Sequence, residues 1–178
     1  MTAPAWFDRS ADLPFVRPVR ADDLDALLAL AALTGGGMTN LPPDRETLAE
    51  KIAWSEASLA ADIATPANEF YLLVLQSGDG RVLGTASLFS RLGAKWPFYS
   101  YKVSRVTHVS RDLDRSFSTE ILHLVNDFDG ASEVGGLFLH PDARAGGLGA
   151  LLARSRYMFI AHHRRRFGDA VIADLRGW

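Results

Sequence analysis

The stretch EVGGLFLHPDARAGGLGALLARSR, residues 133 to 156, constrains the fold of this chain more than any other. A strand-forming run ends at His-Pro-Asp, and after one arginine and three glycines the composition becomes that of a helix, predicted to run for roughly four turns. Downstream, DAVIADLRGW predicts a further strand, and its apolar run indicates that this strand is buried. A strand, a glycine turn, a helix and a second parallel strand form one right-handed βαβ unit.

The turn inside this unit runs from Arg144 to Gly149 with the pattern Arg-x-x-Gly-x-Gly. Its glycines carry no β-carbon, so a ligand can approach the backbone and successive amide groups can converge on it. The helix that begins here adds its unpaired amides and the positive end of its dipole. The turn is therefore predicted to bind an anion such as a phosphate. Glycine turns also precede helices as plain chain reversals, and the spacing alone leaves that alternative open.

The first third of the chain alternates strand-like and helix-like patterns, which is typical of an α/β (α+β) domain. FVRPVR is predicted to be a short edge strand. Asp22 is predicted to cap the helix in DLDALLALAAL, which ends at the glycines of residues 35–37. A second helix is predicted after Pro43, with Asp44 as its N-cap.

The middle of the chain is predicted to be mostly strand. Two β-rich runs in EFYLLVLQSGDGRVLGTASLFSRL flank a Ser-Gly-Asp-Gly turn and predict a hairpin. YSYKVSRVTHVS alternates well enough to be another strand. The structure of residues 112–130 stays open, because STEILHLVND suits a short helical turn as well as an extended segment.

Length and composition favour one domain and narrow its partners. With 178 residues, 48% of them hydrophobic, we expect a flexible tail over residues 1–14 and a single domain over residues 15–178. The formal charge of −2 provides no general attraction to nucleic acid. The absence of cysteine excludes a disulfide framework, a thiolate zinc site and a cysteine nucleophile. Because there is no membrane-length apolar run and no signal-peptide pattern, we expect a soluble cytoplasmic protein that uses no metal and contacts neither nucleic acid nor membrane.

The glycine turn and the strand before it resemble a known ligand-binding loop. Arg-x-x-Gly-x-Gly directly after LFLHPD is similar to the acyl-coenzyme A pyrophosphate loop of the GNAT superfamily of acyltransferases. VRPVRADDLDALLALA resembles the first strand and helix of that fold, and the order of predicted elements matches its first five strands. A dinucleotide-binding fold would place its glycine motif after the first strand. The resemblance implies a GNAT-like mixed sheet flanked by helices, an acyl-CoA N-acyltransferase fold without its last strands.

Within that superfamily the chain resembles the N-terminal half of the arginine N-succinyltransferase family. The matching segments keep the family's order and cover nearly everything from Val16 to Gly177: VRPVR, LTGGGMTNLP, PFYSYKVSRVTHVSRDL, NDFDGASE, LFLHPDARAGGLGALLARSRYMFIA and RFGDAVIADLRG. DRSFSTEILHLV departs from the family pattern. The resemblance implies an enzyme of arginine catabolism that transfers the succinyl group of succinyl-CoA to the α-amine of arginine.

The same resemblance implies either a separate half that works with another chain or a truncated or divergent relative of the family. Family members are about twice as long, and the histidine usually assigned as their proton donor lies beyond the equivalent of Trp178. We therefore expect self-association or a second subunit to complete the fold, and little or no arginine succinyltransferase activity from this chain alone.

The resemblance also assigns residues that contact the acyl donor. The pantetheine arm is expected along Leu137, Phe138 and Leu139, with Leu137 matching the family's succinyl-CoA contact. The pyrophosphate is expected on the loop, which comprises Arg144, Ala145, Gly146, Gly147, Leu148 and Gly149. For the three strand side chains, an ordinary place in the core is the competing interpretation.

Candidates for catalysis and acceptor binding follow from residue chemistry. Glu133 opens the strand before the loop, where a carboxylate can act on an amine directly or through water. His108 can titrate near neutrality. Asp127 and Asp129 can bind a guanidinium through paired hydrogen bonds. Each has a structural alternative. Glu133 can be an ordinary exposed residue at a strand end, and His108 can be a structural histidine with its hydrogen bonds satisfied. The two aspartates can cap their own turn.

A basic run, HHRRRF at residues 162–167, ends the long helix. We interpret it as a solvated end that complements the negative pole of that helix, and we regard Arg144 as the better phosphate partner. A second class of function stays open, namely a non-catalytic module of the same fold that binds acyl-coenzyme A or only a partner subunit.

Overall fold

The computed structural model describes residues 13–175, so most of the predicted tail, residues 1–12, lies outside the described residues. Within this range the chain forms seven strands and three α-helices joined by loops and 3₁₀ turns. In chain order they are β1 (Phe15–Pro18), α1 (Leu24–Ala32), α2 (Arg45–Ala60), β2 (Phe70–Gln76), β3 (Val82–Phe89), β4 (Ser100–Ser110), β5 (Arg115–Val125), β6 (Ser132–Leu139), α3 (Leu148–His162) and β7 (Val171–Ile172).

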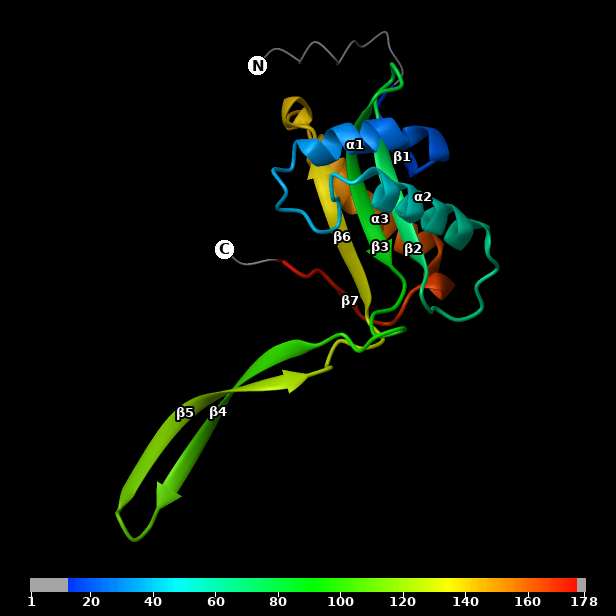
Figure 1. The fold of residues 1–178 in the computed structure, drawn as a ribbon. Coiled ribbons are helices and arrows are strands. Elements are labelled where there is room, and N and C mark those ends of the chain that lie inside the picture. Colours follow the sequence, from blue (N-terminus) through cyan, green and yellow to red (C-terminus); the bar gives the residue numbers. More distant parts are fainter. Residues whose placement is uncertain (1–12, 176–178) are drawn as a thin grey trace.

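Five of the strands in the described range form one sheet in the order β1-β2-β3-β6-β7. β2 and β3 form the predicted hairpin, and neighbours pair antiparallel from β1 to β6. β7 runs parallel to β6 and α3 connects the two, as predicted (Figure 1). The predicted burial of the last strand is wrong. β7 is a two-residue edge strand with Val171 exposed, because no further strand in the described range covers it.

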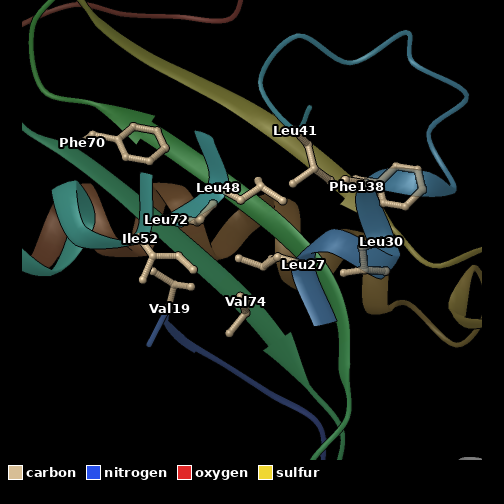
Figure 2. Close-up of a cluster of buried hydrophobic side chains, with 11 residues drawn as sticks. Val19, Leu27, Leu30, Leu41, Leu48, Ile52, Phe70, Leu72, Val74 and Phe138 are labelled. Carbon is tan, nitrogen blue, oxygen red and sulfur yellow. The ribbon is translucent and has the colours of Figure 1, made fainter. Parts of the chain in front are cut away.

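Helices cover both faces of this sheet, with α1 and α2 on one face and α3 on the other (Figure 1). The alternation of β2 explains the two layers, because its side chains point in turn to opposite faces and all from Phe70 to Leu75 are buried. Figure 2 shows the cluster under α1 and α2, which includes Leu27, Leu30, Leu48, Ile52, Phe70, Leu72, Val74 and Phe138. β2, buried on both faces, thus lies inside the sheet that also holds β6.

The predicted N-cap is confirmed for α2 and wrong for α1. Asp44 caps α2 as predicted. Its Oδ1 accepts a hydrogen bond from the backbone N–H of Thr47 at 2.8 Å. The predicted cap by Asp22 is wrong, because a 3₁₀ turn precedes α1 and Asp23 holds that turn. The Asp23 carboxylate accepts hydrogen bonds from the Arg20 N–H at 2.8 Å and from two Arg17 nitrogens at 2.7 Å. Burial raises the pKa of Asp23, but these hydrogen bonds outweigh it and hold the pKa below its ordinary value.

One residue of the basic run at the end of α3, Arg166, contacts the end of α2. Arg166 donates hydrogen bonds to the carbonyl oxygens of Ser58 and Ala61, at 2.7 and 2.8 Å. Its guanidinium also lies 5.9 Å from the ring centroid of Tyr71. The interpretation of this run as a solvated end of α3 is therefore wrong for Arg166, which caps the carbonyl end of α2 and links it to the sheet.

Residues 100–125 form a separate two-stranded hairpin, which we call the β4–β5 arm. β4 and β5 pair with each other along their whole length, from Ser100↔Val125 to Ser110↔Arg115. Figure 1 shows this arm projecting away from the five-stranded sheet. The open question over residues 112–130 is thereby answered, since most of that segment is strand.

One face of the arm is apolar and exposed. Tyr101 lies opposite Leu124 and Val103 lies opposite Leu122, so the four side chains share one face. They are between 57% and 68% exposed. An isolated two-stranded hairpin is marginally stable in water, and contiguous exposed apolar groups of this kind mark contact surfaces.

Candidate functional site

A hollow of about 560 Å³ lies between the end of β6 and the start of α3. The structure thus brings together the strand and the loop that the sequence singled out. The lining residues are Leu137, Phe138, Leu139, Arg144, Ala145, Gly146, Gly147 and Gly149. Leu148 is the one predicted contact absent from this lining. Its side chain is buried in the cluster with Leu152 on the α3 face of the sheet.

The loop presents bare backbone to the hollow. Gly146 and Gly147 have φ angles of +65° and +82°, the left-handed conformation that other residues rarely adopt. A β-carbon at either position would meet no atom within 4 Å, so nothing stands in front of the backbone there. Gly147 is the N-cap of α3, whose first N–H groups have no partners within the helix. Together with the helix dipole they form an anion site.

Arg144 adds a positive charge at the wall of the hollow. Its Nε donates a hydrogen bond to the carbonyl of Leu139 at 3.2 Å. Its guanidinium carbon lies 5.7 Å from the ring centroid of Phe138. A guanidinium fixed in this way can bind phosphate oxygens through paired hydrogen bonds.

β6 supplies the other wall and a free backbone edge. Its pairing with β7 stops at Ser132 and Glu133, so among the described residues no strand covers this edge from Gly135 to Leu139. β6 also bulges at Gly136, where φ is +54° and the register against β3 shifts. An extended ligand can pair with such an edge as an added strand would.

Glu133 lies half-buried where β6 and β7 separate. Burial, and secondarily the negative charge of Asp174, raise the pKa of the Glu133 carboxyl above its ordinary value. A carboxylate with a raised pKa is a stronger base toward an amine or a water molecule. Glu133 therefore lies at the start of the free edge of β6, the strand that lines the hollow.

The other three predicted functional residues lie on the arm or at its base. His108 faces Phe117 near the tip, with the two rings stacked at 5.0 Å between centroids. Asp127 pairs with Lys102 at 2.8 Å, and Asp129 accepts a backbone N–H at 2.7 Å. None of these three described residues lines the hollow. Their contacts favour the structural alternatives, and we do not use them in the proposed reaction.

A larger hollow of about 980 Å³ lies between α1, the β2–β3 turn and the segment after β6. Its arginines include Arg17 and Arg81, which pair with Asp23 and Asp79 at 2.7 and 2.8 Å. These pairs, together with Asp22 and Asp142 in the same lining as Arg20, leave it without the positive character of the loop. Within residues 13–175 there is no cluster of His, Cys, Asp and Glu fit to hold a metal ion, and no helix with the length and apolarity of a membrane span.

Sequence reasoning missed two polar residues beside β6. A β-carbon on Gly135 would lie 3.1 Å from Asn40 Nδ2 and 3.7 Å from Ser87 Oγ. Asn40 follows the unusual run TGGGMT, which is a usable signal. Ser87 stands within the strand run VLGTASLF, where nothing distinguishes it from a structural serine.

The divergence of β6 from β7 beside a glycine loop at a helix N-terminus is the architecture of a GNAT-type acyltransferase fold. The family model of the arginine N-succinyltransferase beta subunit matches residues 14–178. Over 162 residues the chain is 40% identical to arginine N-succinyltransferase subunit beta of Pseudomonas aeruginosa. It is 37% identical to arginine N-succinyltransferase of an Enterobacter species. The chain belongs to the arginine N-succinyltransferase family.

A solved structure confirms the fold prediction. The arginine/ornithine succinyltransferase subunit AI of Pseudomonas aeruginosa superposes with a TM-score of 0.86 at 34% sequence identity. That superposition covers 93% of this chain and 51% of the solved chain. The alignments with the two curated relatives cover 91% of this chain and 47% of each relative. The chain therefore spans about half the length of the curated relatives it matches.

Proposed function

We propose that this chain binds succinyl-CoA and takes part in succinyl transfer to the α-amine of arginine, as a cytoplasmic step of arginine catabolism. The observation that carries the proposal is the hollow at residues 144–149, which continues into the free edge of β6. The names of the two curated relatives support arginine as the acceptor and succinyl as the transferred group.

In this proposal succinyl-CoA lies along the hollow, with its pyrophosphate at the loop and its thioester toward the start of β6. Its pyrophosphate accepts hydrogen bonds from the amides of Gly146–Gly149 and from Arg144. Its pantetheine arm pairs with the β6 backbone at Leu137–Leu139, where an ordinary strand would pair. The thioester then reaches the point where β6 and β7 separate.

The transfer needs a neutral amine, a stabilised oxyanion and a proton for the leaving thiolate. Glu133 takes a proton from the α-ammonium, directly or through water. The amine nitrogen attacks the thioester carbon, and the backbone N–H of Leu137 stabilises the oxyanion that forms. The nitrogen, now bonded to the carbon, loses its extra proton, the C–S bond breaks and the departing thiolate takes up a proton, which gives N-succinylarginine and coenzyme A.

We further propose that a second polypeptide, either another copy of this chain or a second subunit, completes the acceptor side. The exposed apolar face of the β4–β5 arm is the contact surface, because a two-stranded hairpin gains stability when another surface covers such a face. The half-length match to the relatives supports the same proposal.

Release of free thiol from succinyl-CoA tests this proposal. The purified chain is assayed with arginine, alone and together with the unmatched half of the Pseudomonas aeruginosa relative. We expect little release by the chain alone and arginine-dependent release in the mixture. Leu122→Lys on the apolar face should weaken the stimulation, whereas Thr119→Lys on the opposite face should not.

Other outcomes would contradict parts of the proposal. Turnover of about one per second or faster by the chain alone, an ordinary enzymatic rate, would show that no second subunit is needed. Binding of succinyl-CoA without thiol release in any combination would favour the non-catalytic module instead.

A further inference from the structure

Another hollow, of about 310 Å³, lies at the end of α3 opposite to the glycine loop, and we call it the basic hollow. This volume is at the lower end of the range of small-ligand pockets. The turn after α3 forms one wall and the segment after α2 forms the other. The lining residues are Asp62, Ile63, His162, His163, Arg164, Arg165 and Arg166. Five of the seven belong to the basic run, which the proposed function does not use.

The positive charge of the basic hollow is only partly compensated. Arg164 pairs with Asp169 at 2.7 Å. Arg166 donates to carbonyl oxygens at the end of α2, which carry no net charge, so its own charge remains. Arg165 forms no hydrogen bond and no ion pair within residues 13–175. The one acid of the lining, Asp62, is exposed and pairs with none of these arginines in the described part of the chain.

The basic hollow also keeps free donors because the helix ends beside it are already capped. Arg166 serves the last carbonyls of α2. At the end of α3 the backbone N–H groups of His163 and Arg166 donate to the carbonyls of Phe159 and His163, at 2.9 and 2.8 Å. The side chains of His162 and Arg165 therefore have no capping role and can serve a ligand.

Two histidine rings add N–H groups to the same hollow. The rings of His162 and His163 lie 4.7 Å apart between centroids and are nearly perpendicular. Neither ring nitrogen forms a hydrogen bond with another described residue. Burial, and after it the charges of His162 and Arg166, lower the pKa of His163 below its ordinary value. At pH 7 this ring is therefore neutral, and it still offers one N–H to an acceptor.

We propose that the basic hollow binds a small oxyanion, a phosphate or carboxylate group, through the Arg165 guanidinium and the ring N–H groups of His162 and His163. A guanidinium offers paired N–H groups that match two oxygens of such an anion, and the rings add donors beside it. The 15 residues of α3 place this site about 22 Å from the glycine loop. It is thus a second anion site, and it does not depend on acyl transfer.

The ring-proton NMR signals of the histidines test this site. The chain is titrated with inorganic phosphate and separately with succinate, at constant pH and ionic strength in a buffer without other oxyanions. We expect saturable shifts of the His162 and His163 signals, with half-saturation at about 1 mM or below. His108 and His123 on the β4–β5 arm lie outside the lining and should not shift. The anion that binds more tightly identifies the ligand group as phosphate or carboxylate.

Three variants connect the shifts to this hollow. Arg165→Ala should weaken the binding at least about tenfold, because the charged donor is lost. Arg154→Ala is the matched control, since Arg154 is also an exposed arginine on α3 and is not part of the lining, and it should change nothing. Gly147→Glu should leave the titration unchanged, because it alters only the loop at the other end of α3.

The outcomes separate this site from the donor site. Loss of the shifts in Arg165→Ala, with shifts retained in Gly147→Glu, supports the basic hollow whether or not the chain binds succinyl-CoA. No saturable shift with either anion would overturn it. Equal shifts of the arm histidines, or equal affinity in the wild type and Arg165→Ala, would show an adventitious ion only and overturn it. Loss of the shifts in Gly147→Glu would assign the anion to the glycine loop and also overturn it.

Discussion

At the scale of single residues, the site is shaped by side chains that are absent. Gly146 and Gly147 leave the backbone of the loop uncovered, because a β-carbon at either position would meet no atom within 4 Å. Glu133 is a charged group on the same strand as the hollow, at the point where β6 and β7 separate. Its partial burial has a cost that can be measured in the free protein.

Glu133→Gln should stabilise the chain, and more so as the pH rises. Because burial and Asp174 raise the pKa of Glu133 in the folded state, folding favours the protonated carboxyl. The stability of the wild type is therefore lost as the pH rises from the unfolded pKa through the folded pKa. Glutamine mimics the protonated form, so the advantage of the variant should be near zero below the unfolded pKa of about 4 and should grow as the pH rises through the folded pKa.

Urea denaturation of both proteins across this pH range measures the effect. The exposed Glu50 on α2 supplies the control, since Glu50→Gln should give no such pH-dependent gain. An advantage for Glu133→Gln that does not change with pH would contradict the account of Glu133.

At the scale of elements, the site depends on how α2, α3 and the sheet are held together. Arg166 follows α3 directly and hydrogen-bonds two carbonyls at the end of α2. Arg17 and Asp23 form a similar link between β1 and the start of α1. These links keep both helix layers in register with β6, which carries the hollow on its free edge.

Arg166→Ala should lower the free energy of unfolding by about 2–4 kcal/mol, because two charge-assisted hydrogen bonds are lost and two carbonyls at the end of α2 lose their partner. Chemical denaturation should show a lower midpoint with an unchanged slope. The adjacent exposed Arg165 is the control, and Arg165→Ala should change stability by less than about 0.5 kcal/mol. Equal effects of the two substitutions would contradict the capping role.

The elements also show which parts of the fold can be predicted from the sequence. The β6–loop–α3 unit was predictable because its signals are local: a strand run, left-handed glycines and a helical run in direct succession. The exposure of β7 could not be predicted in the same way, because a strand's position at the edge of a sheet depends on pairing between segments far apart in the sequence. Residues 115–125 carried an ambiguous pattern because only the opposite strand of the arm fixes them as extended.

At the scale of the whole molecule, the five-stranded sheet and the β4–β5 arm have different roles. The sheet and its helices form the core and frame the hollow, whereas the arm exposes an apolar face outside that core. The free edge of β6 and this face are both uncovered in the described chain. Both are consistent with a protein that binds the acyl donor itself and receives the rest of the acceptor side from a partner.

The central claim is that the loop at residues 144–149 binds the acyl donor, and calorimetric titration with succinyl-CoA tests it most directly. Gly147→Glu places a side chain and a negative charge in front of the anion site. Gly80→Glu is the matched control, because Gly80 in the β2–β3 turn also has positive φ and open space at its β-carbon.

We predict that succinyl-CoA binds the wild type and Gly80→Glu with the same affinity, and binds Gly147→Glu at least about 100-fold more weakly, a loss of about 2.7 kcal/mol. Circular dichroism confirms that each variant is folded. Unchanged affinity in a folded Gly147→Glu protein would contradict the account.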